Sequence, residues 1–201
     1  MNLKNFFWYF PSAIDSTICK KLIQLDKRKF QRGYTADKQL AVAELKKTRN
    51  SHVKFSNNKW VFDLVNSYMD QANKNAEWNF QTNWIESFQI TRYAKNEFYD
   101  WHVDQKEDPY PITAPNKNYR GKMRKLSLTI NLSDPMTYKG GRLQFEFSKT
   151  SRQQSVIREC VEARAQGSVI VFPSFVLHRV TPVTEGVRYS LVAWFLGEPF
   201  R

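Results

Sequence analysis

His102 and Asp104 form a His-x-Asp pair, a spacing that lets both side chains act on one metal ion. Residues two apart on a β-strand point to the same face, so the imidazole and the carboxylate would lie side by side. One further histidine, His178, would complete a two-His, one-carboxylate set and leave the other face of an octahedral Fe(II) open. The chain has three histidines, and two of them fall in this pattern. The spacing therefore predicts an iron site whose open positions can take a bidentate 2-oxoacid and O2.

Arg188 follows His178 by ten residues and has a natural role beside such a site. A planar guanidinium can grip the far carboxylate of 2-oxoglutarate through paired, charge-assisted hydrogen bonds. The surrounding segment alternates, so Ser190 and Trp194 are expected to share a face with Arg188. An inward arginine without an anion would be a costly buried charge. We therefore predict that Arg188 anchors a bound dicarboxylate.

A lone His-x-Asp pair arises often by chance, but three longer segments surround these residues. They are residues 93–104 (YAKNEFYDWHVD), 126–145 (LSLTINLSDPMTYKGGRLQF) and 167–190 (GSVIVFPSFVLHRVTPVTEGVRYS). In this order they resemble the motifs of the prolyl-4-hydroxylase-like Fe(II)/2-oxoglutarate oxygenases, in particular the bacterial and phage PKHD-type hydroxylases. The resemblance covers roughly residues 85–196. One departure is Asn96, where the family often has glycine, and asparagine tolerates a positive φ better than most residues.

The resemblance implies specific roles around the metal. It assigns His102, Asp104 and His178 to Fe(II), and 2-oxoglutarate and O2 to the role of cosubstrates, with ascorbate as a candidate reductant. Tyr93 matches the tyrosine that hydrogen-bonds the cosubstrate. The cosubstrate pocket is further expected to involve Thr129, Asn131, Leu143, Ser190 and Trp194. Thr129 and Asn131 reach it only if the polar face of their strand looks inward, and the sequence leaves that open.

The expected reaction is oxidative decarboxylation of 2-oxoglutarate to succinate and CO2, coupled to hydroxylation of a substrate C–H. A prolyl or other residue in a protein or peptide is the first expectation for the substrate. The alternative is a nucleic-acid-directed oxygenase, prompted by a net charge of +12, of which residues 1–60 carry +9. A further basic cluster comprises Lys117, Arg120, Lys122, Arg124 and Lys125. A non-catalytic basic binding protein on the same scaffold is the third possibility, although a lapsed site would usually have lost a ligand.

The bulk composition favours one folded domain over residues 1–201, since 41% hydrophobic and 15% aromatic content can form a single core. No apolar run approaches the ~18 residues of a membrane span, and the N-terminal aromatic cluster lacks the parts of a signal peptide. Cys19 and Cys160 have no CxxC spacing and are expected to be reduced thiols. The expected compartment is the cytoplasm, or the host cytoplasm if the chain is phage-encoded, and the oligomeric state is left open.

The periodicity predicts an α+β protein, with a helical N-terminal part over residues 1–80 and a β-rich core over 84–196. Helices are expected at 14–28, capped by Ser12 or Asp15, and at 59–75. Residues 30–58 are polar apart from the apolar stretch 40–45, and a loop with short pieces of structure is expected there. The family resemblance specifies that the core is a double-stranded β-helix (jelly roll) buttressed by the helices. A long loop is expected at 109–124, beside the metal strand, and His52 is expected at the surface. Strands are predicted at 85–93, 98–103, 125–132, 142–147, 155–161, 168–172 and 187–195.

Overall fold

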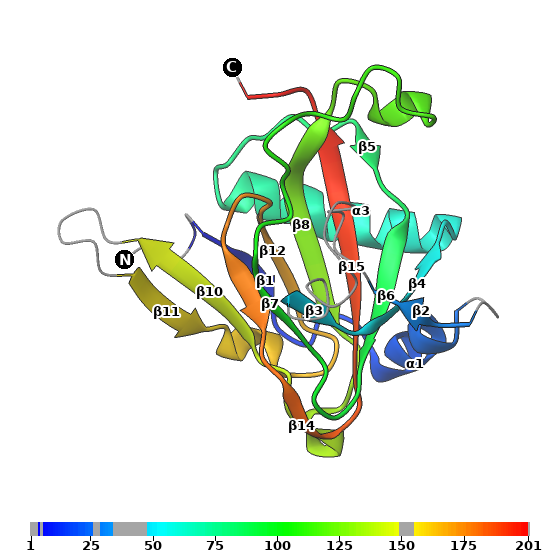
Figure 1. Cartoon of the computed structure of the whole chain (residues 1–201), viewed down its shortest axis with the longest axis vertical. Helices are drawn as coiled ribbons and strands as arrows, with labels where there is room; N and C mark the ends of the chain where they lie inside the picture. Colours follow the sequence, from blue (N-terminus) through cyan, green and yellow to red (C-terminus); the bar gives the residue numbers. More distant parts are fainter. Residues whose placement is uncertain (1–3, 5, 26–28, 34–47, 149–154, 201) are drawn as a thin grey trace.

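A computed structural model describes residues 4, 6–25, 29–33, 48–148 and 155–200 (Figure 1). These residues form mostly β-sheet with two α-helices. The helices are α1 (Ser16–Gln24) and α3 (Lys59–Asn75), and 3-10 turns lie at Lys117–Tyr119, Pro135–Thr137 and Val161–Ala163. The strands are β1 (Trp8–Phe10), β2 (Gln31–Arg32), β3 (Arg49–Asn50), β4 (His52–Ser56), β5 (Trp84–Ile85), β6 (Phe88–Tyr93), β7 (Phe98–His102), β8 (Met123–Asn131), β9 (Tyr138–Gly140), β10 (Leu143–Ser148), β11 (Ser155–Glu159), β12 (Val169–Pro173), β13 (His178–Val180), β14 (Val183–Gly186) and β15 (Arg188–Gly197).

The larger sheet has the strand order β1-β12-β8-β15-β6-β4-β2, and β5 pairs with the end of β15. Its centre is the long antiparallel pair of β8 and β15, which runs from Asn131 opposite Ser190 to Met123 opposite Gly197, with a shift in register between Phe195 and Leu196. The apolar alternate residues of β8 pack in one core cluster with Val61 and Val65 of α3. The helices therefore cover one face of this sheet (Figure 1).

The smaller sheet has the order β11-β10-β13-β7-β3 and packs on the other face of the larger sheet. Phe145 of β10 meets Phe172 of β12 edge to face, with ring centroids 5.2 Å apart. Both rings belong to a second apolar cluster that lies between the sheets. His178 and His102 lie on β13 and β7, which are adjacent strands of the smaller sheet. The packing of the two sheets therefore fixes the position of these predicted ligands relative to the larger sheet.

Helix α3 confirms the prediction at 59–75, and its buried residues recur at helical spacing. Helix α1 is shorter than predicted, because it starts after Asp15 and ends at Gln24. Asp15 is the cap, accepting a 2.7 Å hydrogen bond from the Thr17 amide. Ile14 lies before the helix and donates its amide to the Gly167 carbonyl at 3.0 Å, which commits it to a tertiary contact. The predicted residues 26–28 lie outside the described part of the chain.

The expectation of a loop with short pieces of structure at 30–58 holds over its described ends, but the sequence did not identify these pieces as strands of the two sheets. Strand β4 pairs with β6 in the larger sheet, and β3 pairs with β7 in the smaller one. The chain thus crosses from one sheet to the other at Ser51, which is fully buried. Sequence pattern missed these strands because buried polar groups such as Lys54 are satisfied by tertiary contacts, here a 2.9 Å hydrogen bond to the Ile23 carbonyl. The apolar stretch at 40–45 lies outside the described residues.

The strand predictions in the core hold with small shifts at their ends, but one predicted strand is two. Residues 85–93 split into β5 and β6 because Glu86 turns inward to meet Arg124. The short strands β1, β9, β13 and β14 were not predicted, since three or four residues give no period. Between β7 and β8 the predicted long loop is present, with one 3-10 turn at Lys117–Tyr119. Cys19 and Cys160 are buried free thiols, as predicted. Neither α-helix in the described part is long and apolar enough to cross a membrane.

Phe145→Ala is expected to lower the free energy of unfolding by about 3–5 kcal/mol, because it removes a fully buried ring from between the sheets. Ile157→Ala on the neighbouring strand β11 is the control, since that side chain is 51% exposed, and a change within about 1 kcal/mol is expected. Chemical denaturation of both variants measures the difference. Equal losses would contradict the assignment of Phe145 to the inter-sheet core.

Candidate metal centre

The side chains of His102, Asp104 and His178 converge, with one ligand atom of each lying within 4.8 Å of the others. The Asp104 carboxylate lies between the histidines, 3.8 Å from His102 Nε2 and 3.7 Å from His178 Nε2. The convergence follows from sheet register, because His178 of β13 is the direct antiparallel partner of His102 of β7. The structure therefore brings together all three predicted ligands.

Asp104 lies two residues beyond the end of β7 and is held there by its own main chain. Its amide donates to the Ser174 carbonyl at 2.9 Å, and its carbonyl accepts from Arg124 Nη1 at 3.3 Å. The Ser174 hydroxyl is in turn hydrogen-bonded to that of Ser127 on β8, at 2.9 Å. The larger sheet thus fixes the carboxylate relative to the two histidines of the smaller sheet.

Hydrogen bonds at the far side of each imidazole fix its tautomer. His102 Nδ1 lies 2.7 Å from the Asp100 carbonyl oxygen, and His178 Nδ1 lies 2.9 Å from that of Val176. A carbonyl oxygen can only accept, so each Nδ1 must carry the proton and donate. Each Nε2 then presents a lone pair toward Asp104, which is the arrangement a metal-binding histidine requires.

The protonation states also suit a divalent metal. Burial, together with the neighbouring His178, lowers the pKa of His102 to about 3, so that His102 is neutral at neutral pH. Burial raises the pKa of Asp104, but the two histidines and Arg124 more than offset this, and the carboxyl group is ionised. A neutral imidazole and a carboxylate are ready to bind a cation without first losing a proton.

A narrow pocket extends from the three ligands between the sheets, and Arg188 forms part of its wall. Arg188 is 3% exposed, and its guanidinium carbon lies 5.6 Å from the centre of the Tyr93 ring. Within the described residues, Arg188 Nη1 is buried and has no hydrogen-bond partner. A buried guanidinium nitrogen without a hydrogen-bond partner is unfavourable, and a bound carboxylate would satisfy it. The pocket residues therefore fit a metal-chelating 2-oxo dicarboxylate.

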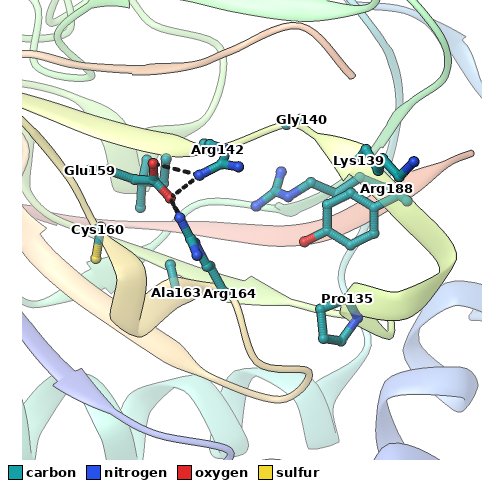
Figure 2. A pocket seen from close by; sticks show the side chains of 12 residues that line it. Pro135, Lys139, Gly140, Arg142, Glu159, Cys160, Ala163, Arg164 and Arg188 are labelled. Carbon is teal, nitrogen blue, oxygen red and sulfur yellow. Dashed lines mark hydrogen bonds and ion pairs between the residues drawn. The ribbon is translucent and has the colours of Figure 1, made fainter. Parts of the chain in front are cut away.

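Figure 2 shows a second pocket, which shares Arg188 and Leu143 with the metal pocket. In it, Arg142 and Arg164 both form ion pairs with Glu159. No carboxylate in the described part of the chain lies within ion-pair distance of Arg188. Arg142 and Arg164 thus have a carboxylate partner within the protein, whereas Arg188 has none among the described residues.

The structure also places the other predicted cosubstrate residues. Tyr93, Thr129, Leu143, Ser190 and Trp194 all line the metal pocket, so the polar face of β8 does look inward at Thr129. Asn131 does not line it. Its amide donates instead to the main-chain carbonyls of Ser133 and Arg164, at 3.2 and 2.7 Å, and so braces the segment before β12.

Five further residues line the pocket that were not assigned to it from sequence: Gln89, Tyr99, Phe172, Val180 and Val192. Alternation could have found three of them, since Gln89 shares a strand face with Tyr93, Val192 shares one with Arg188, and Val180 shares one with His178. Nothing in the sequence marks Phe172, which reaches the pocket through the packing of one sheet on the other. Asn96 adopts φ 64°, as the substitution for glycine suggested.

Residues 88–196 match the family described as the 2OG-Fe(II) oxygenase superfamily. A PKHD-type hydroxylase of Escherichia coli O9:H4 is 38% identical over 106 residues, which are 52% of this chain and 40% of that protein. The chain therefore spans about two fifths of the length of the curated relatives it matches.

Two solved structures have a similar fold. A Pseudomonas putida prolyl-4-hydroxylase gives a TM-score of 0.65 at 17% identity, over 96% of this chain and 95% of that one. A viral collagen prolyl hydroxylase from Paramecium Bursaria Chlorella virus-1 gives 0.63 at 16% identity, over 96% of both chains. With the family match over more than half of its length and three side chains placed so that they could hold a metal ion, this chain belongs to the 2OG-Fe(II) oxygenase superfamily.

Proposed function

We propose that this chain is an oxygenase that uses Fe(II), 2-oxoglutarate and O2 to hydroxylate a C–H bond of a prolyl or other residue in a protein or peptide, with succinate and CO2 as co-products. The observation that carries the proposal is one buried pocket that contains both the two-His, one-carboxylate triad and Arg188, an arginine with no carboxylate partner among the described residues. The PKHD-type relatives and the prolyl-hydroxylase fold support the choice of substrate class.

In this proposal His102, Asp104 and His178 hold the iron, and Arg188 with Tyr93 holds the C5 carboxylate of 2-oxoglutarate. Thr129 and Ser190 offer hydroxyl groups along the pocket, while Leu143 and Trp194 supply apolar walls. Iron and 2-oxoglutarate, when bound, supply the oxidant from O2. The protein orients the cosubstrate, excludes water and shields the oxidant from its own side chains.

We further propose that residues 84–196 form a double-stranded β-helix within a single domain. Two groups of four strands support this, β12-β8-β15-β6 in the larger sheet and β11-β10-β13-β7 in the smaller. Successive strands β6, β7, β8 and β10 alternate between the two sheets, as the turns of such a helix require.

A peptide substrate fits the surroundings of the site better than a polyanion does. In the basic cluster at 117–125, Arg124 makes a two-pronged ion pair with Glu86, and Lys125 is 5% exposed and lies over the Phe200 ring. These two charges are therefore committed to internal contacts. Two exposed apolar residues adjoin the site in sequence instead: Val103, between His102 and Asp104, is 45% exposed, and Phe175, next to Ser174, is 49% exposed.

Removing a ligand is expected to abolish Fe(II) binding and succinate formation, because two remaining side chains cannot hold the ion in the facial arrangement. His178→Ala and Asp104→Ala are the tests, with circular dichroism to show that each variant is folded. His52→Ala is the control, since His52 pairs with Glu97 at 2.8 Å and lies outside the metal pocket. Substantial succinate production by both ligand variants would rule out the assigned triad.

Arg188→Ala is expected to raise the KM for 2-oxoglutarate by about 30-fold or more, since losing one partner of a buried charged hydrogen bond costs about 2–5 kcal/mol. Pyruvate, which lacks the second carboxylate, should support little turnover by the unaltered enzyme. Arg142→Ala is the matched control, because Arg142 lies in the neighbouring pocket and pairs with Glu159 (Figure 2). If pyruvate served as well as 2-oxoglutarate, Arg188 would not be the anchor.

The substrate class can be tested by substrate-stimulated 2-oxoglutarate consumption across a salt series. Proline-containing peptides should stimulate consumption with little dependence on salt. A duplex bound through phosphates would instead lose affinity with a log–log slope of about 0.9 per neutralised phosphate. Stimulation by methylated oligonucleotides alone, lost at high salt, would show that the nucleic-acid alternative is correct.

A further inference from the structure

Arg49 lies on β3, outside the family-matched residues 88–196, yet its side chain packs beside the metal centre. β3 pairs with β7, and Arg49 is the direct partner of Tyr99 in the register. The guanidinium carbon lies 4.5 Å from the centre of the Tyr99 ring, and Arg49 as a whole is 6% exposed. This is the geometry of a desolvated cation–π contact.

The Tyr99 ring also stacks on the imidazole of His102. The two ring centroids lie 3.4 Å apart, and the ring planes differ by 11°. Tyr99 itself lines the metal pocket. A guanidinium, a phenol ring and a metal-binding imidazole are thus linked by face contacts, and we call them the Arg49–Tyr99–His102 stack.

An ion pair does not account for the position of Arg49. Its Nε donates to the Ser51 hydroxyl at 2.8 Å, and Nη2 is buried without a hydrogen-bond partner among the described residues. No described carboxylate lies within ion-pair distance of the guanidinium. Burying an arginine in this way is unfavourable unless another contact compensates, and the Tyr99 ring is the contact that is present.

The backbone around Arg49 is shaped to receive it. Gly33 donates its amide to the Ser51 carbonyl at 2.8 Å. A Cβ at Gly33 would come within 2.9 Å of Arg49 Nε and 2.8 Å of Ser51 Oγ, so a larger residue would displace the arginine or the serine. Gly33, directly after β2, therefore approaches Arg49 closely and confines its guanidinium against the Tyr99 ring.

We propose that Arg49 is a positioning residue, which holds Tyr99 against His102 and thereby fixes the plane of that imidazole for metal binding. The hydrogen bond from Nδ1 to the Asp100 carbonyl fixes one edge of the His102 ring, and the Tyr99 stack fixes its face. These two contacts together fix the orientation of the ring, so that its Nε2 points toward Asp104. The inference rests on the proposed assignment of His102 as an iron ligand.

Proton NMR of the metal-free protein tests the stack without any turnover. The chain has three histidines, so the ring C–H signals of His102 can be assigned by substitution. In the unaltered protein, the Tyr99 ring current should shift these signals upfield. In Arg49→Leu the signals should move downfield, toward the values of an unstacked imidazole. Arg49→Lys keeps a cation, so its signals should retain most of the upfield shift. Arg32→Leu is the control, because Arg32 lies on the adjoining β2 and donates to Asn50 at 2.9 Å.

Metal titration under anaerobic conditions tests the consequence. Arg49→Leu should weaken Fe(II) or Co(II) binding by about 10-fold, in the range found when outer partners of metal ligands are removed. Arg49→Lys should stay within about threefold of the unaltered protein. Tyr99→Leu should show the same loss as Arg49→Leu, and the double variant should be no weaker than the worse single one, because both act through one ring.

Unchanged His102 signals and unchanged metal affinity in Arg49→Leu would overturn the inference, and so would fully additive losses in the double variant. Should Arg49→Leu fail to fold, Arg49→Gln replaces it, because glutamine keeps a donor for Ser51 without the charge. The two proposals remain distinguishable. If the unaltered protein bound no iron, the proposed function would fail, while the ring signals would still decide whether the stack exists.

Discussion

Two adjacent antiparallel strands must keep one register for the metal centre to exist. His178 faces His102 because β13 and β7 pair at that position. A slip of one residue would turn one imidazole to the opposite face of the sheet. The pairing of β13 and β7 does not position Asp104, because this residue lies beyond the end of β7. The turn after β12 holds it instead, through a hydrogen bond from the Asp104 amide to the Ser174 carbonyl. The site therefore depends on the packing of the smaller sheet on the larger one.

Burial governs the chemistry of the pocket. The arginine next to Asp104, Arg124, is compensated by Glu86, which makes that pair part of the scaffold. Arg188 and Arg49 are almost fully buried and have no carboxylate partner among the described residues. Uncompensated buried cations are rare because they oppose folding, and they mark places where a ligand or an aromatic face supplies the missing interaction. We propose that a cosubstrate carboxylate supplies this interaction to Arg188, whereas the Tyr99 ring supplies it to Arg49.

Sequence predicted the parts of this account that have strong local signals. Alternation placed Ser190 and Trp194 on the face of Arg188, and helical period placed 59–75. It failed where tertiary contacts override local pattern. The short strands β3 and β4 form by pairing with β7 and β6. Asn131 lies in a strand of alternating polar residues, which suggested the pocket, but its side chain bonds to a neighbouring loop instead. Tyr99 and Arg49 carry no local sign of their stack, because 50 residues of chain separate them.

The most direct test of the central claim is an anaerobic titration of the protein with Fe(II) in the presence of 2-oxoglutarate, followed by visible absorption. Chelation of Fe(II) by a 2-oxoacid at an open facial site gives a charge-transfer band. The account predicts a band that saturates at one iron per chain and disappears in Asp104→Ala. Iron binding without such a band, or a band of full strength in that variant, would contradict it.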